Sequence, residues 1–342
     1  MAKGALRPAS DKEREIGRLL ITGANGMVGY AIRQMELPET VFLTHEDLDL
    51  TDFQATRSVF QDLNPERVIH LASAVAGISG NIDHPGTLFQ RNIMMNTNVL
   101  ESARCAGVQK LISFMSTCVF PDQCSYPLNE REIHNGPPPP SNAGYAYAKR
   151  MLEVQTRTYH EEWGCDFVVA IPTNIYGPND IFSLKYAHVI PALIHKVFLA
   201  KQDGTDLVVW GTGKPLREFI FSQDIAKLSV WALDNYLERS PIIFSPSNEI
   251  SIRAVVELIV SKLGFNGNVV FDESKPDGQY RRTTDNTKLL KYRPDFSFTP
   301  LEEGIETTVN WFLKNYPNVR LFHVKHLMSA LKWPAMIATF EH

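Results

Sequence analysis

The sequence predicts an α/β protein in which a doubly wound parallel sheet is joined to a smaller, interleaved α/β domain. Short apolar segments alternate with helical stretches through the first half of the chain. A glycine-rich turn links the first apolar segment to the first helical stretch. The 342 residues are also enough for a large core or for two domains.

The alternation gives each expected element in turn. The expected strands are Arg18–Thr22, Thr40–Leu43, Arg67–Leu71, Lys110–Met115 and Phe167–Ile171. The expected helices include Asp52–Leu63, Thr87–Ala106 and Ala143–Trp163. Right-handed crossovers between such strands give a parallel sheet that binds its ligand at the carboxyl ends of the strands.

The remaining segments are less regular. Pro121–Asn142, which contains four consecutive prolines, is expected to be a long loop that could cover a site. The pattern loosens after Pro172–Pro178, yet Arg217–Phe221 and Ile242–Phe244 resemble strands that return to the main sheet. The predicted division is therefore 18–178 with 216–247 in the main domain, 179–215 with 248–319 in the smaller one, and tails at 1–17 and 320–342.

The C-terminal tail is basic and apolar. Near-helical spacing relates Leu321, Val324, Leu327, Met328 and Leu331. A docked helix, a partner contact and a loose tail all fit this pattern, and His323 and His326 are expected at the surface rather than as metal ligands.

Composition narrows the class of protein. Hydrophobic residues are 44%, charged residues 21% and the formal net charge is −4, so the basic excess typical of nucleic-acid binding is missing. No apolar run approaches a membrane span, and the first twenty residues lack a signal-peptide core. Four cysteines show no paired spacing: Cys105, Cys118, Cys124 and Cys165. We expect a cytoplasmic enzyme with reduced thiols, no metal, and no nucleic-acid or membrane partner.

The glycine-rich turn indicates a nucleotide site. It reads Gly23-Ala24-Asn25-Gly26-Met27-Val28-Gly29 and directly follows the apolar run Leu19–Ile21. Glycines admit a close approach of the backbone, and the free N–H groups and dipole of the following helix favour a diphosphate. A tight turn alone is the alternative, but the strand before and the helix after favour a dinucleotide.

Tyr145 and Lys149 lie four residues apart in an expected helix, which places a phenol beside an ammonium. A neighbouring cation is expected to make the phenol give up its proton more readily. Tyr145 could then protonate a carbonyl oxygen as a hydride arrives. The same spacing also occurs on ordinary solvated helix faces.

Ser116 and Cys118 follow the expected strand Lys110–Met115. In extended backbone their side chains would share one face. Each alone could be a strand-end cap or a small buried hydrophobe. Together with Tyr145 and Lys149, however, Ser116 completes an arrangement suited to ketone reduction.

These motifs resemble those of the extended short-chain dehydrogenases/reductases, which have a Rossmann-type fold, and within them the epimerase-reductases that act on GDP-4-keto-6-deoxy-D-mannose. The resemblance runs from about Leu19 to about Tyr316. Beyond the motifs above it rests on Pro172–Asn174, His188–Pro191, Val209–Gly213 and Lys275–Gly278.

The resemblance implies a role for each site residue. Ser116, Tyr145 and Lys149 match the reductive triad, and Cys118 and His188 match the acid/base pair for epimerisation at C3 and C5, with a protonated His188 favouring the Cys118 thiolate. The product would be GDP-L-fucose. NADP would be held by Gly23–Gly29, Lys149, Pro172, Thr173, Asn174, Ile175 and His188. The GDP-sugar would be held by Lys196, Trp210, Arg217 and Asp277.

Some positions depart from the pattern. Ala76 stands where these enzymes usually have a Gly-Gly pair. No arginine is obvious for a ribose 2′-phosphate, since Asn25 and His45 are weak substitutes, and Glu46 and Asp47 come slightly late to select NAD. NADP as cofactor therefore rests mainly on the resemblance.

Two alternatives remain open. One is another sugar-nucleotide enzyme of the same fold, an NAD-dependent 4-epimerase or a 4,6-dehydratase. A dehydratase would place a carboxylate pair after Ser116, where this chain has Thr117, Cys118 and Val119. The other is a non-catalytic NADP-binding protein, which would not need the complete set of reactive residues.

The resemblance also implies a homodimer, in which the helices Thr87–Ala106 and Ala143–Trp163 form a four-helix bundle with those of a second subunit. Candidate contact residues are Val99, Leu100, Met151 and Leu152, although an intramolecular core explains them equally well.

Overall fold

The computed structural model describes residues 18–75, 77–275 and 277–321. Its main sheet has six strands in the order β2-β1-β3-β4-β5-β9, and all of its neighbouring pairs are parallel. The strands are β1 (Leu19–Thr22), β2 (Thr40–Leu43), β3 (Arg67–His70), β4 (Lys110–Phe114), β5 (Phe167–Pro172) and β9 (Ile242–Phe244). Because β2 and β3 lie on opposite sides of β1, the strand order reverses there, which makes the adjacent strand ends the natural ligand site.

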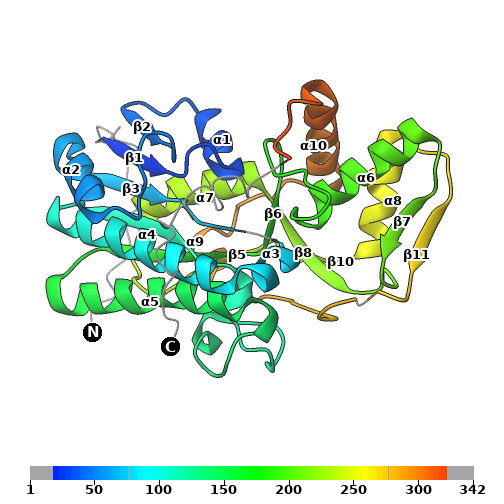
Figure 1. Ribbon diagram of the computed structural model, residues 1–342. Helices are drawn as coiled ribbons and strands as arrows, with labels where there is room; N and C mark the ends of the chain where they lie inside the picture. The colour runs from blue at the N-terminus through cyan, green and yellow to red at the C-terminus, as the bar shows by residue number, and fades with distance from the viewer. Residues whose placement is uncertain (1–17, 76, 276, 322–342) are drawn as a thin grey trace, which may run out of the picture.

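Helices cover both faces of this sheet (Figure 1). One face carries α2 (Phe53–Leu63), α4 (Pro85–Cys105) and α5 (Ala143–Trp163), and the other carries α1 (Met27–Arg33), α7 (Ser222–Asn235) and α9 (Thr287–Tyr292). In β1, Leu20 packs in the core under α2, α4 and α5, while Leu19 and Ile21 pack in the core under α1, α7 and α9. This alternation is what a strand buried on both faces requires. The predicted doubly wound α/β fold is confirmed.

The helix ends have local causes. The Asp52 side chain accepts a hydrogen bond from the Ala55 N–H at 3.0 Å, so it caps α2 instead of joining it. α4 starts at Pro85, two residues before the predicted Thr87, because proline has no N–H to lose in a first helical turn. α5 ends at Gly164, which adopts φ 71°.

A second, smaller half lies beside the main sheet, at the right of Figure 1. It contains a three-stranded sheet of β10 (Glu249–Ser251), β8 (Leu216–Phe221) and β6 (Asn174–Tyr176), and a pair formed by β11 (Val269–Asp272) and β7 (Leu207–Trp210). Its helices α6 (Val189–Asp203), α8 (Ile252–Leu263) and α10 (Leu301–Asn315) enclose a third core that includes Ile194, Val256 and Phe312. The short helix α3 (Ile78–Asp83) precedes α4.

One strand prediction is wrong. Ile242–Phe244 does return to the main sheet as β9, but Arg217–Phe221 belongs to β8, which pairs with β6 and β10. Ile220 packs in a core of the main sheet, whereas Phe219 and Phe221 pack in the third core. The strand therefore lies between two cores, and its apolar sequence could not show which sheet it joins. The domain boundaries given above remain predictions.

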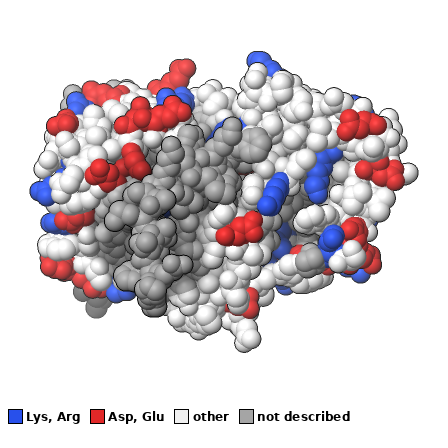
Figure 2. All heavy atoms as spheres, in the orientation of Figure 1, with Lys and Arg blue, Asp and Glu red and all other residues white. Residues whose placement is uncertain are grey.

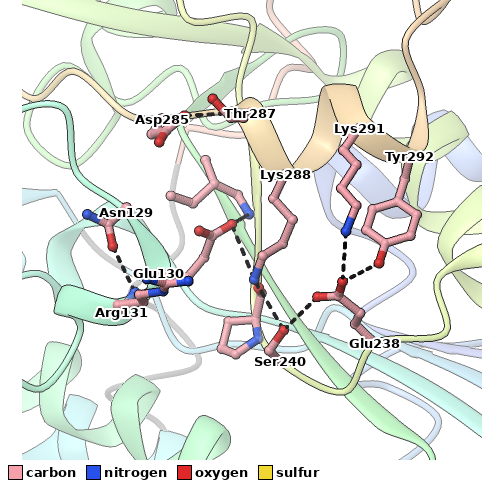
Figure 3. A network of polar contacts seen from close by, with 12 residues as sticks. Asn129, Glu130, Arg131, Glu238, Ser240, Asp285, Thr287, Lys288, Lys291 and Tyr292 are labelled. Atoms are coloured by element: carbon pink, nitrogen blue, oxygen red, sulfur yellow. Dashed lines mark hydrogen bonds and ion pairs between the residues drawn. The ribbon is translucent and has the colours of Figure 1, made fainter.

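The loop Pro121–Asn142 contains two short 3-10 turns, Glu130–Glu132 and Pro140–Asn142. Glu130 holds it against the outer strand of the main sheet, because its carboxylate accepts a hydrogen bond from the Ile243 N–H at 3.0 Å. Lys288 of α9 lies 3.9 Å from the same carboxylate and donates to the Pro241 carbonyl at 2.8 Å (Figure 3). A backbone donor at the edge of the sheet is thus satisfied, and the loop has a fixed anchor.

The tails lie almost entirely outside the described residues, as do His323, His326 and Ala76. Arg320 and Leu321 are described, and the Arg320 carbonyl accepts a hydrogen bond from the Phe182 N–H at 2.8 Å. Within the described ranges, no helix has the length and apolar character needed to cross a membrane.

Candidate active site

A cavity of about 930 Å³ lies at the carboxyl ends of β1, β3, β4 and β5. Its wall brings together the residues expected to hold the dinucleotide with most of those expected to do chemistry. It is lined by Gly23–Gly29, Ser116, Tyr145, Lys149, Pro172–Ile175 and His188, among others. Segments that are distant in the sequence thus meet at one site.

The glycine turn has no room for a side chain at Gly23 or Gly29, and without side chains a ligand can approach its backbone closely. Gly23 adopts φ +70°, and a Cβ there would lie 2.6 Å from the Ala72 nitrogen. A Cβ on Gly29 would lie 2.5 Å from the Ala24 carbonyl oxygen. α1 starts directly after Gly26 with no side-chain cap and no acidic residue in its first turn. Its first N–H groups are therefore available to a diphosphate, and the residues fit a dinucleotide.

Lys149 is a buried cation next to Tyr145. Its Nζ lies 5.9 Å from the centre of the Tyr145 ring, and the residue is 3% exposed. Burial lowers the pKa of Lys149 to about 8. Burial also raises the pKa of Tyr145, and a hydrogen bond with Ser73 only partly opposes this. Burial therefore exceeds the acidifying effect expected of the neighbouring cation, and Tyr145 keeps its proton at neutral pH, as a proton donor must.

Ser116 is in extended backbone as expected, but Cys118 is not. Thr117–Val119 forms a 3-10 turn after β4, and the Ser116 hydroxyl accepts a hydrogen bond from the Cys118 N–H at 3.4 Å. A serine hydroxyl at a strand end competes for nearby backbone donors, which favours such a turn. Ser116 consequently lines the cavity, whereas Cys118 is buried and is not among the residues that border it.

Cys118 and His188 are not coupled as expected. Burial raises the pKa of the Cys118 thiol, and the groups that act in the opposite direction are Ser116, Arg282 and Lys149. His188 precedes α6 and opens onto the cavity, but the surrounding protein lowers its pKa. The positive charges that favour the thiolate are Lys149 and Arg282, and not His188.

The four residues expected to hold the GDP-sugar do not line the cavity. Lys196 Nζ lies 5.2 Å from the ring centre of Trp210, which is 63% exposed. The Asp277 carboxylate accepts hydrogen bonds from the Thr212 N–H and hydroxyl, both at 2.7 Å. Asp277 also attracts the partly buried Arg217 guanidinium. Figure 2 shows Lys and Arg side chains grouped on this half of the molecule, where an anionic ligand would be attracted.

Sequence reasoning missed two residues of the site. Arg282 acts electrostatically on both Cys118 and Arg217, so it connects the Cys118 thiol with the smaller half of the molecule. Its only signal was the pair Arg281-Arg282 shortly after Lys275–Gly278. Ser73 bonds Tyr145 and donates to the Asn92 side chain at 2.8 Å, and no sequence pattern marked it.

Comparison with known proteins agrees with this geometry. Residues 19–245 match the NAD dependent epimerase/dehydratase family. The chain is 48% identical over 311 residues to the GDP-L-fucose synthase of Dictyostelium discoideum, a match that spans 88% of this chain and 97% of the relative. The chain belongs to the GDP-L-fucose synthase family.

Two further relatives extend the match. The GDP-L-fucose synthase of Escherichia coli K12 is 35% identical over 319 residues, spanning 89% of this chain and 98% of the relative. A solved GDP-L-fucose synthetase from Naegleria fowleri bound to NADP superposes with a TM-score of 0.86 at 42% identity, covering 92% of this chain and 99% of that structure. NADP in that relative agrees with the fit of a dinucleotide to the glycine turn of this family member.

Asp180 is a buried acid in the wall of the same cavity. It is 5% exposed, one carboxylate oxygen accepts from the Ile181 N–H at 2.7 Å, and the other has no hydrogen-bond partner among the described residues. Burial raises the pKa of Asp180 from 3.8 to about 7, although Arg320 opposes the shift. Between about pH 4 and pH 7 the folded protein thus retains a proton that the unfolded chain releases. Its stability should fall as pH rises through that range.

We predict that Asp180→Asn removes this pH dependence. The apparent stability of the variant relative to wild type should rise between pH 4 and pH 8 by as much as about 4 kcal/mol, because one pKa unit corresponds to about 1.4 kcal/mol. Thermal unfolding of both proteins across this pH range measures the difference. Parallel profiles for the two proteins would show that Asp180 ionises normally in the fold.

Proposed function

We propose that this protein converts GDP-4-keto-6-deoxy-D-mannose to GDP-L-fucose by epimerisation at C3 and C5 followed by NADPH-dependent reduction at C4. The observation that carries the proposal is a single cavity lined by the glycine turn, Ser116, Tyr145, Lys149 and His188. Cys118 is buried within the electrostatic reach of Lys149. The names of the relatives agree with it.

In the reductive step, bound NADPH supplies a hydride to C4. Tyr145 delivers a proton to the C4 oxygen, and the Ser116 hydroxyl holds that oxygen in place. Lys149 stabilises the tyrosinate left behind, because its ammonium lies beside the ring. Because the pKa of Tyr145 is raised, its phenol is fully protonated, and can donate that proton, when the substrate arrives.

In the epimerisation, the C4 ketone makes the C3 and C5 hydrogens acidic. Cys118 and His188 divide the proton transfers: one removes a proton from the carbon, and the other returns a proton to the opposite face. Because burial raises the pKa of the Cys118 thiol, the thiol must lose its proton before it can act as the base, and Lys149 and Arg282 favour that ionisation.

The GDP part of the substrate lies against the smaller half. Lys196 and Arg217 offer charge to the diphosphate, Trp210 offers an aromatic face, and Asp277 offers a hydrogen-bond acceptor. Incubation with GDP-4-keto-6-deoxy-D-mannose and NADPH, with the product identified by NMR, tests the whole proposal. A product other than GDP-L-fucose, or no product, refutes it.

The proposed chemistry needs no metal, nucleic acid or membrane partner, and we place the enzyme in the cytoplasm. Among the described residues, no group of three or more His, Cys, Asp or Glu side chains could hold a metal ion.

We further propose a homodimer formed through α4 and α5. Three of the four expected contact residues, Val99, Leu100 and Leu152, are fully buried in the protein's own core, but Met151 is 39% exposed. These two helices also expose Phe89, Met94 and Tyr147. Light scattering at micromolar concentration should give twice the monomer mass, and Met151→Glu should reduce it. Leu313→Glu, on exposed α10 surface, should leave the mass unchanged; a monomeric wild type contradicts the proposal.

Tyr145→Phe should abolish reduction and preserve epimerisation, because only the C4 oxygen loses its proton donor. We expect NADPH consumption to fall by about 10²- to 10⁴-fold. Deuterium from D₂O should still enter C3 and C5, as NMR would show. Tyr147→Phe, two residues along the same helix, is the control. Loss of exchange along with reduction would mean that Tyr145 also stabilises the enolate.

Cys118→Ser should slow proton abstraction by orders of magnitude, because a hydroxyl is far less acidic than a thiol of pKa about 8.5. Reduction should survive, so directly reduced, unepimerised GDP-6-deoxy sugars should accumulate. His188→Asn should behave similarly, and Cys165→Ser is the matched control. If Cys118→Ser makes GDP-L-fucose at an undiminished rate, the base lies elsewhere.

A further inference from the structure

We propose that Arg33 recognises the 2′-phosphate of NADPH and so gives the enzyme its preference for NADPH over NADH. The inference rests on the proposed use of a nicotinamide dinucleotide. Arg33 would supply the guanidinium that is not apparent in the sequence around the glycine turn or after the second strand.

Arg33 lies where the adenosine ribose of a bound dinucleotide is expected. It is the last residue of α1 and lines the same cavity as the glycine turn. Thr44 and His45, the two residues directly after β2, line this cavity too. In doubly wound folds of this kind, an acid near this point binds the 2′-hydroxyl of NAD, whereas an arginine accommodates the 2′-phosphate of NADP.

The guanidinium of Arg33 is oriented but not neutralised. Its central carbon lies 4.1 Å from the centre of the Phe42 ring in β2. Stacking on an aromatic face restricts the guanidinium plane and leaves its N–H edges free to bind a phosphate through two parallel hydrogen bonds. Arg33 is exposed, and no ion pair involves it in the part of the chain that the structure describes.

Two acids that follow β2, Asp47 and Asp49, are both hydrogen-bonded to neighbouring threonines. One oxygen of Asp47 accepts hydrogen bonds from both the Thr44 N–H at 2.8 Å and the Thr44 hydroxyl at 2.7 Å. Asp47 is not among the residues that border the cavity. Arg33 and His45 both act electrostatically on Asp47, which shows that they face the same corner. Asp49 does border the cavity, but its carboxylate accepts hydrogen bonds from the Thr51 N–H at 3.0 Å and hydroxyl at 2.8 Å, and lies 3.7 Å from Arg91. A ribose at this corner would therefore meet Arg33, while both acids are already hydrogen-bonded.

The other arginines of the cavity have different contacts. Arg91 lies 3.7 Å from the Asp49 carboxylate. Arg320 donates to the Asn179 carbonyl at 3.1 Å, and Asn179 in turn donates to the Asn25 carbonyl in the glycine turn. Arg33 is thus the arginine of the cavity wall that lies beside the end of β2.

The test measures equilibrium binding of NADPH and NADH to the full-length protein by nucleotide fluorescence, without substrate. Arg33→Gln should weaken NADPH binding by roughly ten- to a hundredfold, the value of one charged hydrogen-bond pair. NADH binding should not change. Arg33→Lys should retain part of the preference, because lysine keeps the charge but not the two-pronged geometry. Arg57→Gln, on exposed surface of α2, is the control and should alter neither affinity.

Each other outcome is decisive. Equal losses for NADPH and NADH in Arg33→Gln would show that Arg33 supports the fold of the site rather than the 2′-phosphate, and would overturn the proposal. Unchanged NADPH affinity would overturn it as well, while leaving the proposed reaction intact. If the wild-type protein binds neither nucleotide, the proposed cofactor itself is wrong, and the role of Arg33 falls with it.

Discussion

The burial of the Lys149 ammonium is the constraint on which the site depends. A charge that is 3% exposed loses most of its hydration, and no carboxylate pairs with it among the described residues. Its charge instead acts on its neighbours. It adds to the effect of burial in lowering the pKa of His70, favours ionisation of Cys118, and lies beside the ring of Tyr145. A single unneutralised cation thus helps to set the protonation states of several groups around the reacting carbon.

The fold can hold such a charge because rigid elements surround it. Lys149 is in α5, which packs against the main sheet and carries Tyr145 one turn earlier. Beneath it, His70 bonds Thr22 at 2.7 Å and Asn96 at 3.1 Å, so the ends of β1 and β3 and the middle of α4 are joined by polar contacts. These contacts satisfy buried groups that would otherwise weaken the sheet at its open end.

The sequence predicted local structure well and spatial relations less well. Apolar runs located the six strands of the main sheet to within one residue at each end, because period and turn residues are local signals. The partners of β8, the 3-10 turn around Cys118 and the position of Arg282 depend on distant segments. So does the direction of the pKa shift of Tyr145, since burial outweighs the neighbouring cation. Arg33 was overlooked because its closeness to β2 exists only in three dimensions.

The anchored loop Pro121–Asn142 has a mechanical consequence. Its Leu128 exchanges backbone hydrogen bonds with Thr283 and Asp285, both at 2.8 Å, directly beside Arg282. The loop begins three residues after Cys118. The Cys118 thiol and the Arg282 guanidinium therefore lie on two segments that are joined by backbone hydrogen bonds. If the smaller half moves relative to the main sheet as sugar nucleotides bind and leave, these backbone hydrogen bonds limit how far the thiol and the guanidinium can separate. The thiol then keeps a similar electrostatic environment throughout the catalytic cycle.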